Sequence, residues 1–395
     1  MLDLKELSIK YKFSIDSLKH LQAVYGYELK KVVQALKSPG KKYYFRANTL
    51  KASPEEIMKS LREKGFNVKQ HSIIKEALYI PIEGPFEIPI FNKKVIVDKF
   101  TAESVLQGAH VYAPGIKKCS KIKKGDLVTI VDELNQEIAS GIAKMDETEI
   151  LIFRKGLAIE IVYSKYKVPS LRETEEFKNG LIYPQSFPAI LACKILNPQP
   201  YEEIADVAAA PGGKTGALAQ LMQNKGVIYA IDRNKVKIGK LQETIKRLGI
   251  INVKLMCHDS RYLDVDFPSL KFQKALIDPP CSSLGVRPKI YENCKSSKIY
   301  ALSEYQKQFL FSISKSIKPG GTIVYSTCTL TIEENEGIVK FALEKCGLKV
   351  IEQNYFFGSP GLDHVVPEAA LTQRFNPHIH EDCPGFFIAK FSYKE

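Results

Sequence analysis

Residues 203–224, EIADVAAAPGGKTGALAQLMQN, hold an apolar strand, a glycine loop and the start of a helix in one short run. The strand is EIADVA at 203–208, and the helical segment begins at Lys214. Further apolar segments of strand length follow, most of them separated by helical segments, at 226–232, 252–257, 274–280 and 321–327. Strands that alternate with helices predict an α/β fold, a parallel sheet covered on both faces. In such a sheet ligands bind at the carboxyl ends of the strands.

The residues that follow these strands predict a site for adenosine. The loop DVAAAPGGKTG (206–216) lets the backbone approach a ligand closely and opens a helix whose amide groups favour an anion. It is neither GxGxxG nor GxxxxGK[ST], which makes it a weak match for dinucleotide and P-loop sites. Asp232 ends the second strand and suits ribose hydroxyls, while Asp259 follows the third strand and could accept from an adenine amino group. S-adenosylmethionine fits such a rim, because it joins adenosine to an amino-acid tail without a pyrophosphate.

Two cysteines stand at the ends of the fourth and fifth strands. IDPPCSSLG (277–285) contains Asp278 and Cys281, and YSTCT (325–329) contains Cys328. Taken alone, Cys281 could be a nucleophile, a metal ligand or a small apolar residue. Beside a methyl donor, two thiols favour covalent catalysis on a pyrimidine: a thiolate adds to carbon 6, and carbon 5 can then attack the methyl sulfonium. Such a thiolate needs a depressed pKa. Asp278 would hold the base edge, and the second thiol would assist product release.

The first part of the chain has a different pattern. Apolar spacing predicts one helix over 14–38, and YYFRANTL (43–50) predicts a strand. ASPEEIMKSLREKG (52–65) predicts a helix with Ser53 as N-cap and Glu56 completing a capping box.

From residue 94 onward, short β segments predict a small barrel. KVIVDKF (94–100) is expected to be a strand and TAESVLQGA (101–109) a short helix. Four more strands are predicted at 126–132, 137–144, 149–156 and 158–164. Lysines 117, 118, 121, 123 and 124 crowd the loop that enters this barrel.

Composition restricts the class of protein. A chain of 395 residues is long enough for two or three domains. Its net charge of +13 favours a polyanionic partner such as nucleic acid, and residues 1–165 carry 28 Lys and Arg against 20 Asp and Glu. The eight cysteines form no CxxC pair, which gives a zinc ribbon little support. No apolar run is long enough for a membrane span and the N-terminus does not read as a signal peptide, so we expect a cytoplasmic protein.

Four stretches, AAAPGGKT (208–215), DPPCS (278–282), YSTCT (325–329) and QRFNPH…GFFIAKF (373–391), resemble the Sun (NSUN) family of RNA 5-methylcytosine methyltransferases. The resemblance covers essentially the whole chain. FRANTLKASPEEI is similar to the family's N-terminal RNA-binding segment. GAHVYAPGIKKCSKIKKGD (108–126) is similar to a PUA domain, an RNA-binding barrel.

The resemblance implies an architecture and a substrate. It implies an α+β RNA-binding segment at 1–93, a PUA-like β-barrel at 94–166, and a Rossmann-like S-adenosylmethionine-dependent methyltransferase domain at 167–395. Members with a PUA domain act on tRNA, at the last paired cytosine of the acceptor stem.

The resemblance also implies site residues by position. Cys328 would be the attacking thiol, Cys281 would assist release, and Lys214 would lie near the reacting centre. The residues implied to contact S-adenosylmethionine or line its pocket are Ala208, Ala209, Ala210, Pro211, Gly212, Gly213, Lys214, Asp232, Asp259 and Asp278. Those implied or expected on the RNA side are Tyr112, Lys117, Lys118, Lys121 and Arg374, with His378 beside Arg374.

The predicted enzyme needs no metal, no membrane and no obligate protein partner, and we expect a monomer. Two alternatives stay open from the sequence. One is a cytosine-5 methyltransferase of ribosomal RNA, and the other is a non-catalytic tRNA-binding factor with a vestigial methyltransferase fold.

Overall fold

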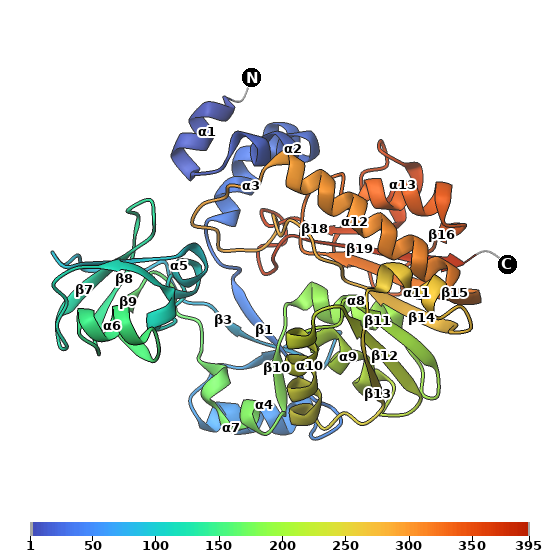
Figure 1. The fold of residues 1–395 in the computed structure, drawn as a ribbon, viewed down its shortest axis with the longest axis horizontal. Helices are drawn as coiled ribbons and strands as arrows, with labels where there is room; N and C mark the ends of the chain where they lie inside the picture. The colour runs from blue at the N-terminus through green and yellow to red at the C-terminus, as the bar shows by residue number, and fades with distance from the viewer. Residues whose placement is uncertain (1–2, 394–395) are drawn as a thin grey trace.

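The C-terminal half of the chain forms one large mixed sheet, visible on the right of Figure 1. The structure, a computed structural model, describes residues 3–393. In this part of the chain the strand order is β13-β12-β11-β14-β15-β19-β18-β17, with β16 paired to β19. Strands β11 to β15 are parallel, and β19 is antiparallel to β15. The bounds are β11 (Glu203–Val207), β12 (Val227–Asp232), β13 (Val253–Cys257), β14 (Phe272–Ile277), β15 (Ile317–Thr327), β16 (Leu348–Val350), β17 (Ser359–Pro360), β18 (Gln373–Phe375) and β19 (Phe386–Tyr393).

Helices cover both faces of this sheet, as the near-continuous apolar strands predict. Side chains alternate between the faces: Ile204 belongs to one buried cluster and Ala205 to the other. The helices on the first face are α8 (Phe187–Leu196), α9 (Gly213–Leu221) and α10 (Lys235–Leu248). Those on the second face are α11 (Leu263–Asp266), α12 (Ser296–Lys315) and α13 (Glu336–Lys345). The predicted α/β class is confirmed.

The strand order reverses beside β11. The chain continues from β11 to β12 and β13 on one side, and then crosses to β14 on the other side. A reversal of this kind opens a crevice at the carboxyl ends of the two strands that flank it. The loops after β11 and β14 therefore face each other, and they carry the glycine loop and Asp278.

A four-stranded antiparallel sheet, in the order β10-β1-β3-β2, packs against the first-face helices. Its bounds are β1 (Lys42–Ala47), β2 (Lys69–Gln70), β3 (Ala77–Pro81) and β10 (Ile182–Pro184), with α4 (Pro54–Glu63) and α7 (Glu175–Lys178) beside it. The capping box of Ser53 and Glu56 at the start of α4 is present as predicted. β10 pairs with β1 although it lies beyond residue 166, where the sequence analysis placed the start of the methyltransferase domain.

Three short helices precede this sheet: α1 (Leu4–Tyr11), α2 (Ile15–Tyr25) and α3 (Leu29–Leu36). The prediction of a single helix over 14–38 is wrong, because the chain breaks at Gly26. Gly26 has a φ of 51°, a left-handed value that ends α2 and starts a 3₁₀ turn. The apolar faces of these helices enclose Leu330, a residue of the loop that follows β15.

A six-stranded barrel-like sheet, in the order β5-β9-β8-β7-β4-β6, forms the left part of Figure 1. Its strands are β4 (Lys94–Val97), β5 (Val111–Tyr112), β6 (Ile116–Cys119), β7 (Leu127–Val131), β8 (Glu137–Ala143) and β9 (Leu157–Ser164), and its helices are α5 (Lys99–Val105) and α6 (Glu147–Phe153). The prediction of a strand at 149–156 is wrong. Asp146 and Glu149 form a capping box that starts α6 there.

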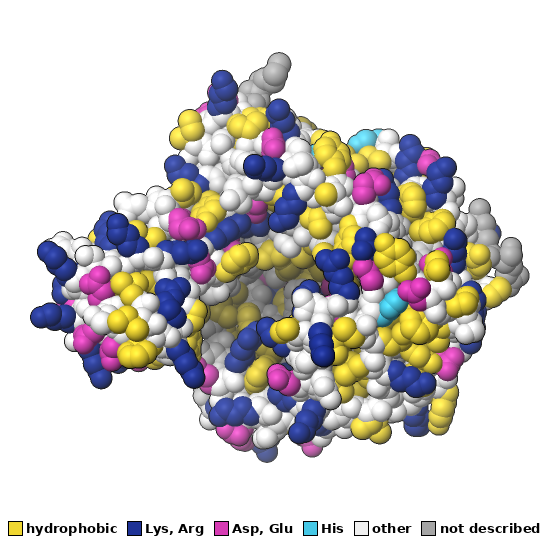
Figure 2. All heavy atoms as spheres, in the orientation of Figure 1, with side chains coloured by type: hydrophobic (Ala, Val, Ile, Leu, Met, Phe, Trp, Pro, Cys, Tyr) yellow, Lys and Arg dark blue, Asp and Glu magenta, His cyan; other side chains and the backbone are white. Residues whose placement is uncertain are grey.

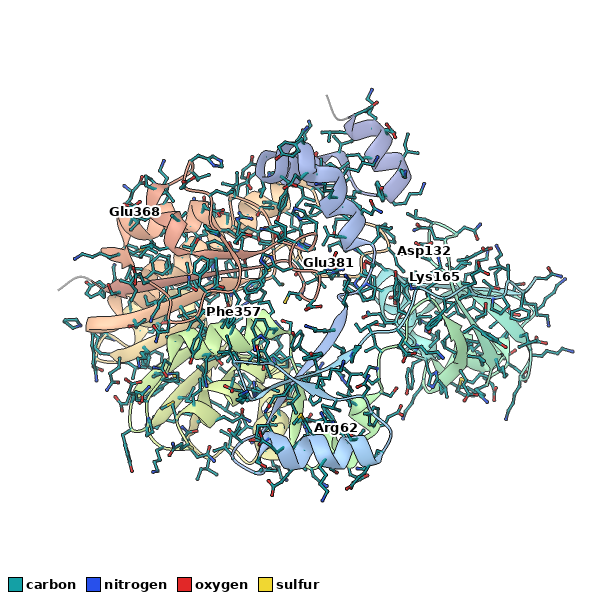
Figure 3. All side chains as sticks on the ribbon, turned by 180° about the vertical axis from the view of Figure 1, so that it is seen from behind. Arg62, Asp132, Lys165, Phe357, Glu368 and Glu381 are labelled. Atoms are coloured by element: carbon teal, nitrogen blue, oxygen red, sulfur yellow. The ribbon has the colours of Figure 1, made fainter. Side chains whose placement is uncertain are left out.

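The parts meet around Arg287. Its guanidinium donates to the carbonyl oxygens of Ser38 at 2.9 Å, Pro39 at 2.8 Å and Pro377 at 3.1 Å, which joins the end of α3 to the C-terminal domain. In Figure 3, seen from behind, Glu381 lies at this junction, with Asp132 and Lys165 toward the barrel. Figure 2 shows a hollow between the barrel and the rest of the molecule, with Lys and Arg side chains on its rim. None of the described helices is both long and apolar enough to cross a membrane.

Candidate active site

A cleft of about 350 Å³ opens at the carboxyl ends of the parallel strands. Its volume is in the range typical of pockets for small molecules. The sequence-predicted residues that line it come from five separate loops: Ala208, Ala210, Asp232, Asp259, Asp278, Cys281 and Cys328. The fold thus brings together the acids and both thiols that the sequence spreads over 121 positions, from 208 to 328.

The glycine loop forms one wall of this cleft. Ala208 has a φ of 61° and Gly212 a φ of 102°, so the chain turns sharply between β11 and α9. A Cβ atom at Gly212 would lie 2.6 Å from Leu241 of α10, which explains why glycine stands there. Ala209 is buried under the loop. The remaining predicted loop residues line a smaller cavity of about 170 Å³ that shares Ala208, Ala210 and Asp278 with the cleft: Ala209, Pro211, Gly213 and Lys214.

The two rim carboxylates differ in their partners. Asp232 accepts at Oδ1 from the backbone N–H of Asn234 at 3.0 Å, and among the described residues no donor is bonded to its Oδ2. Asp259 is held by Arg261, whose Nε lies 3.0 Å from Oδ1 and whose Nη2 lies 2.7 Å from Oδ2. These hydrogen bonds from Arg261 lower the pKa of Asp259 below its usual value. Asp259 is therefore ionised, with part of its accepting capacity already occupied.

Cys281 and Cys328 lie next to each other in the lining of the cleft, and their sulfur atoms are 3.3 Å apart. The Ser283 hydroxyl lies 3.5 Å from the sulfur of Cys328 and 3.8 Å from that of Cys281. The hydrogen bond from Cys281 lowers the pKa of Cys328 despite burial and the negative charge of Asp278, and the hydrogen bond with Ser283 and the positive charge of Lys214 act in the same direction. The same contact raises the pKa of Cys281, and burial adds to the effect. The geometry thus favours a thiolate at Cys328 and a thiol at Cys281.

Lys214 and Asp278 form an ion pair beside these thiols. Lys214 Nζ lies 2.5 Å from Asp278 Oδ2, and the Ser326 hydroxyl donates to Oδ1 at 3.0 Å. Burial would lower the pKa of Lys214, but the charge of Asp278 and the hydrogen bond to it outweigh burial and raise the pKa. Lys214 is therefore a cation paired with Asp278 and close enough to Cys328 for its charge to act on that thiol.

The cleft has the chemistry that S-adenosylmethionine requires. Asp232 offers a carboxylate oxygen for ribose hydroxyls, and the small side chains of Ala208 and Ala210 leave room at the backbone. Tyr305 and Phe309 of α12 add aromatic surface on which an adenine ring can lie. When bound, this donor would supply a methyl group on a sulfonium. In the described chain no group of three or more His, Cys, Asp or Glu side chains could hold a metal ion.

The structure does not support Arg374 as an RNA contact. Arg374 is 2% exposed, and its guanidinium forms a two-point ion pair with Glu336, which is fully buried. A further bond joins its Nη1 to the Leu330 carbonyl oxygen at 3.0 Å. The prediction for Arg374 is corrected on this physical ground, because no donor of the side chain faces solvent. His378 is similarly packed, with a ring 5.5 Å from that of Tyr25.

The other predicted RNA residues all lie on the surface of the barrel. Tyr112 at the end of β5 is 56% exposed. Lys117 and Lys118 project from β6, and Lys121 lies in the turn that follows. Among the described residues none of these three lysines has a carboxylate within ion-pair distance. Their charges are therefore available for a phosphate backbone.

Sequence reasoning missed several residues of the cleft. Tyr305 and Phe309 enter it from α12, a helix without any motif that marks it. Arg261, which holds Asp259, does not line the cleft and carried no signal of its own. Asp206 at the end of β11 accepts from Thr215 Oγ1 at 2.6 Å, and burial raises its pKa to about 7. A carboxylate within the strand that leads into the glycine loop was the one available signal for Asp206.

Comparisons with known proteins identify all three parts of the chain. The family described as 16S rRNA methyltransferase RsmB/F matches residues 193–392. The PUA domain matches residues 93–163, and the ferredoxin-like domain of RsmF/B-like methyltransferases matches residues 17–87. The predicted fold, with its small PUA barrel and α+β N-terminal segment, is thereby confirmed.

Individual relatives agree with these matches. A tRNA (cytosine(72)-C(5))-methyltransferase of Pyrococcus horikoshii is 45% identical over 369 residues, which are 92% of each chain. The mouse protein named tRNA (cytosine(72)-C(5))-methyltransferase NSUN6 is 31% identical and covers 85% of this chain and 82% of its own. The crystal structure of NSun6 from Pyrococcus horikoshii with SFG aligns with a TM-score of 0.90 at 42% identity, over 98% of this chain and 99% of that one. The chain therefore belongs to the RsmB/F (Sun) family of methyltransferases, enzymes that depend on S-adenosylmethionine.

Proposed function

We propose that this protein methylates carbon 5 of cytosine 72 in tRNA, the last paired cytosine of the acceptor stem. The observation that carries the proposal is the pair of thiols 3.3 Å apart, opening into the same cleft as the predicted donor site. Three relatives that match over more than four fifths of both chains, at 45%, 31% and 29% identity, are named for cytosine 72 of tRNA. One relative named for rRNA matches over a similar share of both chains at 24% identity. A relative named for 28S rRNA matches 232 residues, 55% of this chain and 28% of its own. Among the relatives that match over most of both chains, those named for tRNA have the higher identity, which favours tRNA over ribosomal RNA.

The reaction begins with the Cys328 thiolate. Its sulfur forms a bond to carbon 6 of the flipped cytosine, and the π electrons of the 5,6 double bond move to carbon 5. Asp278 holds the base edge by accepting from the amino group, and from ring nitrogen 3 when that nitrogen carries a proton. Lys214 binds the carboxylate from the other side. Carbon 5 would then take the methyl group with the electron pair released by the addition. The bond between that methyl group and the donor sulfur would break, and its electrons would return to the sulfur, so that the sulfonium leaves as a neutral thioether.

Product release restores the aromatic base. Carbon 5 loses its proton, the electrons of that C–H bond re-form the 5,6 double bond, and the bond between carbon 6 and the Cys328 sulfur breaks. Cys281 lies within 3.3 Å of that sulfur as a thiol. It donates its proton to the departing sulfur and, as a thiolate, accepts the proton from carbon 5. The proton lost by the base thus remains on the pair of cysteines until solvent removes it.

The three parts of the chain divide the work in this proposal. Residues 1–93 and the barrel at 94–166 bind RNA, and residues 167–395 carry the chemistry. Tyr112, Lys117, Lys118 and Lys121 are the barrel residues proposed to bind the acceptor end. Their exposure suits a contact that holds tRNA while the target base enters the cleft.

The test uses labelled S-adenosylmethionine and two tRNA transcripts that differ only in having C or U at position 72. Label should enter the C72 transcript alone. Cys328→Ala should abolish incorporation and the protein–RNA adduct, and Cys281→Ala should accumulate a slowly released adduct. Cys346→Ala is the matched control, because that buried cysteine lies at the end of α13, outside the cleft. Full incorporation by Cys328→Ala would refute the mechanism, and label in ribosomal RNA but not in tRNA would refute the substrate.

A further inference from the structure

Glu334 is a fully buried carboxylate that accepts hydrogen bonds from five donors. Its Oε1 accepts from the backbone N–H of Ser282 at 2.8 Å and from Gln306 Nε2 at 3.0 Å. Its Oε2 accepts from three hydroxyls, those of Ser282 at 2.5 Å, Thr331 at 3.0 Å and Thr329 at 3.3 Å. In the part of the chain that the structure describes, no cation lies within ion-pair distance of Glu334. Hydrogen bonds alone therefore keep this charge in the interior.

These contacts fix the loop that carries Cys281 on both sides of the cysteine. The residue after it, Ser282, binds Glu334 through its backbone and its hydroxyl. The residue before it, Pro280, accepts from Gln306 Nε2 at 3.0 Å, the same group that donates to Glu334. Cys281 thus sits between two anchored neighbours.

The loop that carries Cys328 is held in the same way. Thr329 donates its hydroxyl to Glu334 and accepts at its carbonyl from Asn335 Nδ2 at 3.2 Å. Thr327, on the other side of the cysteine, donates to Asn335 Oδ1 at 2.6 Å. The hydroxyl oxygens of Ser282 and Thr329 also lie 2.6 Å apart, so the two loops are in contact beside the carboxylate.

The chemistry of the five donors requires a carboxylate. One backbone N–H, one amide NH₂ and three hydroxyls converge on two oxygens, and an ionised carboxylate is the side chain that accepts at both atoms without donating. A glutamine of equal size would turn its own NH₂ toward some of these donors. Glu334 contacts neither sulfur, but its charge is among the causes of the raised pKa of Cys281, after the hydrogen bond to Cys328 and burial.

From this geometry we infer that Glu334 is the positioning residue that fixes the two cysteine loops relative to each other and so decides which thiol attacks. The inference rests on the proposed function, because it assigns the attack to Cys328 and the release step to Cys281. It adds a residue that touches neither substrate nor donor and acts through Ser282 and Thr329.

The experiment compares Glu334→Gln with the wild-type chain and with Glu176→Gln. Glu176 is 2% exposed, accepts from Ser60 and Lys64 in the N-terminal domain, and is a matched control for the loss of a buried carboxylate. Two quantities are measured: the rate of alkylation by iodoacetamide at each cysteine, read by peptide mass spectrometry without RNA, and steady-state methyl transfer to tRNA.

In the wild-type chain Cys328 should alkylate faster than Cys281. Glu334→Gln should lower the ratio of the Cys328 alkylation rate to the Cys281 alkylation rate at least about 10-fold. It should lower kcat about 10- to 100-fold and leave KM for the donor within about 3-fold, because a small misplacement of a reacting group costs rate rather than binding. Glu176→Gln should leave the alkylation ratio and kcat unchanged.

A wild-type alkylation ratio in Glu334→Gln, with a kcat that falls no more than in Glu176→Gln, would overturn the inference. Ser282→Ala serves if Glu334→Gln does not fold. It keeps the backbone bond to Glu334 but loses the hydroxyl that donates to Glu334 and contacts Thr329. An unchanged alkylation ratio in that variant would be equally decisive against the inference. The alkylation measurement needs no RNA, so a failure of the proposed tRNA activity leaves it interpretable and distinguishable.

Discussion

Gly285→Ala should impair both stability and methyl transfer, because two glycine backbones touch beside Cys328, the proposed nucleophile. Gly285 donates its N–H to the Cys328 carbonyl oxygen at 3.0 Å and accepts from the N–H of Gly385 at 2.7 Å. A Cβ atom at Gly285 would lie 2.3 Å from the Gly385 oxygen and 2.8 Å from its Cα. Neither atom belongs to a flexible side chain, so the two backbones must separate.

The size of the effect follows from these distances. Ordinary contact begins near 3.4 Å, so the segments must move apart by about 1 Å. Weakening two hydrogen bonds costs roughly 1 kcal/mol each. Overpacking adds roughly 1–3 kcal/mol, which gives a loss of about 3–5 kcal/mol in the free energy of unfolding. A shift of about 1 Å at the loop that carries Cys328 should lower the rate of methyl transfer about 100-fold.

Denaturant unfolding and single-turnover methyl transfer measure the two quantities, and Gly239→Ala is the control. Gly239 is exposed within α10, and a Cβ atom there would meet nothing within 4 Å. The same substitution should therefore stabilise the chain by about 0.5–1 kcal/mol and leave the rate unchanged. Wild-type stability and rate in Gly285→Ala would show that the contact between the two glycines does not hold the loop of Cys328.

Three further predictions concern charge. Burial raises the pKa of Asp206 to about 7, so the folded chain binds the proton of this carboxyl group more tightly than the unfolded chain does. The free energy of unfolding should therefore fall as pH rises from about 4 to about 7 and then level off. Asp206→Asn should remove that fall in thermal unfolding across the window, and an unchanged pH profile would contradict the raised pKa. Arg374→Met should destabilise the fold by about 3–5 kcal/mol, because it leaves the buried charge of Glu336 without its partner. The double variant with Glu336→Gln should recover part of this loss. Weaker tRNA binding at unchanged stability would instead support Arg374 as an RNA contact. Lys117→Ala and Lys118→Ala should each reduce by about one the slope of the logarithm of the tRNA-binding constant against the logarithm of salt concentration, while donor binding stays constant. Titrations at several salt concentrations measure this slope. Unchanged slopes would remove both lysines from the interface.

The parallel sheet could be predicted from sequence because its strands are buried on both faces. Runs such as 203–208 and 226–232 are almost continuously apolar and are bounded by turn residues, and the structure places β11 and β12 there within a residue or two. The glycine loop and the two cysteines each follow one of the strands of this sheet. Because ligands bind at the carboxyl ends of parallel strands, the sequence predicts that these residues lie at one edge of the sheet.

Two local errors have identifiable causes. Residues 149–156 are rich in β-branched and aromatic side chains, but the capping box of Asp146 and Glu149 starts a helix, the same signal that was interpreted correctly at Ser53 and Glu56. The long helix predicted over 14–38 contains Gly26, whose left-handed backbone separates α2 from α3. In both places a short-range signal at one position outweighed the apolar periodicity of its neighbours.

The interior of the site could not be predicted from spacing, because its contacts join segments far apart in the chain. The sulfur atoms of Cys281 and Cys328 are separated by 47 residues, and the Ser282 contact to Glu334 by 52. A motif marks which residues matter to a family without distinguishing those that touch the substrate from those that hold them.

Arg374 illustrates this difference physically. It lies in a late motif and was assigned to RNA, yet its guanidinium is buried against Glu336 and bonds to the carbonyl of Leu330, two residues beyond Cys328. Glu334 acts on the same loop from the other side through Thr329. Together these two buried charges bind the segment that carries Cys328, the proposed nucleophile, so we expect a change at either residue to alter the reaction without altering any contact with RNA. Loss of activity on mutation therefore cannot by itself assign a residue of this family to its substrate, and the stability of the variant has to be measured alongside.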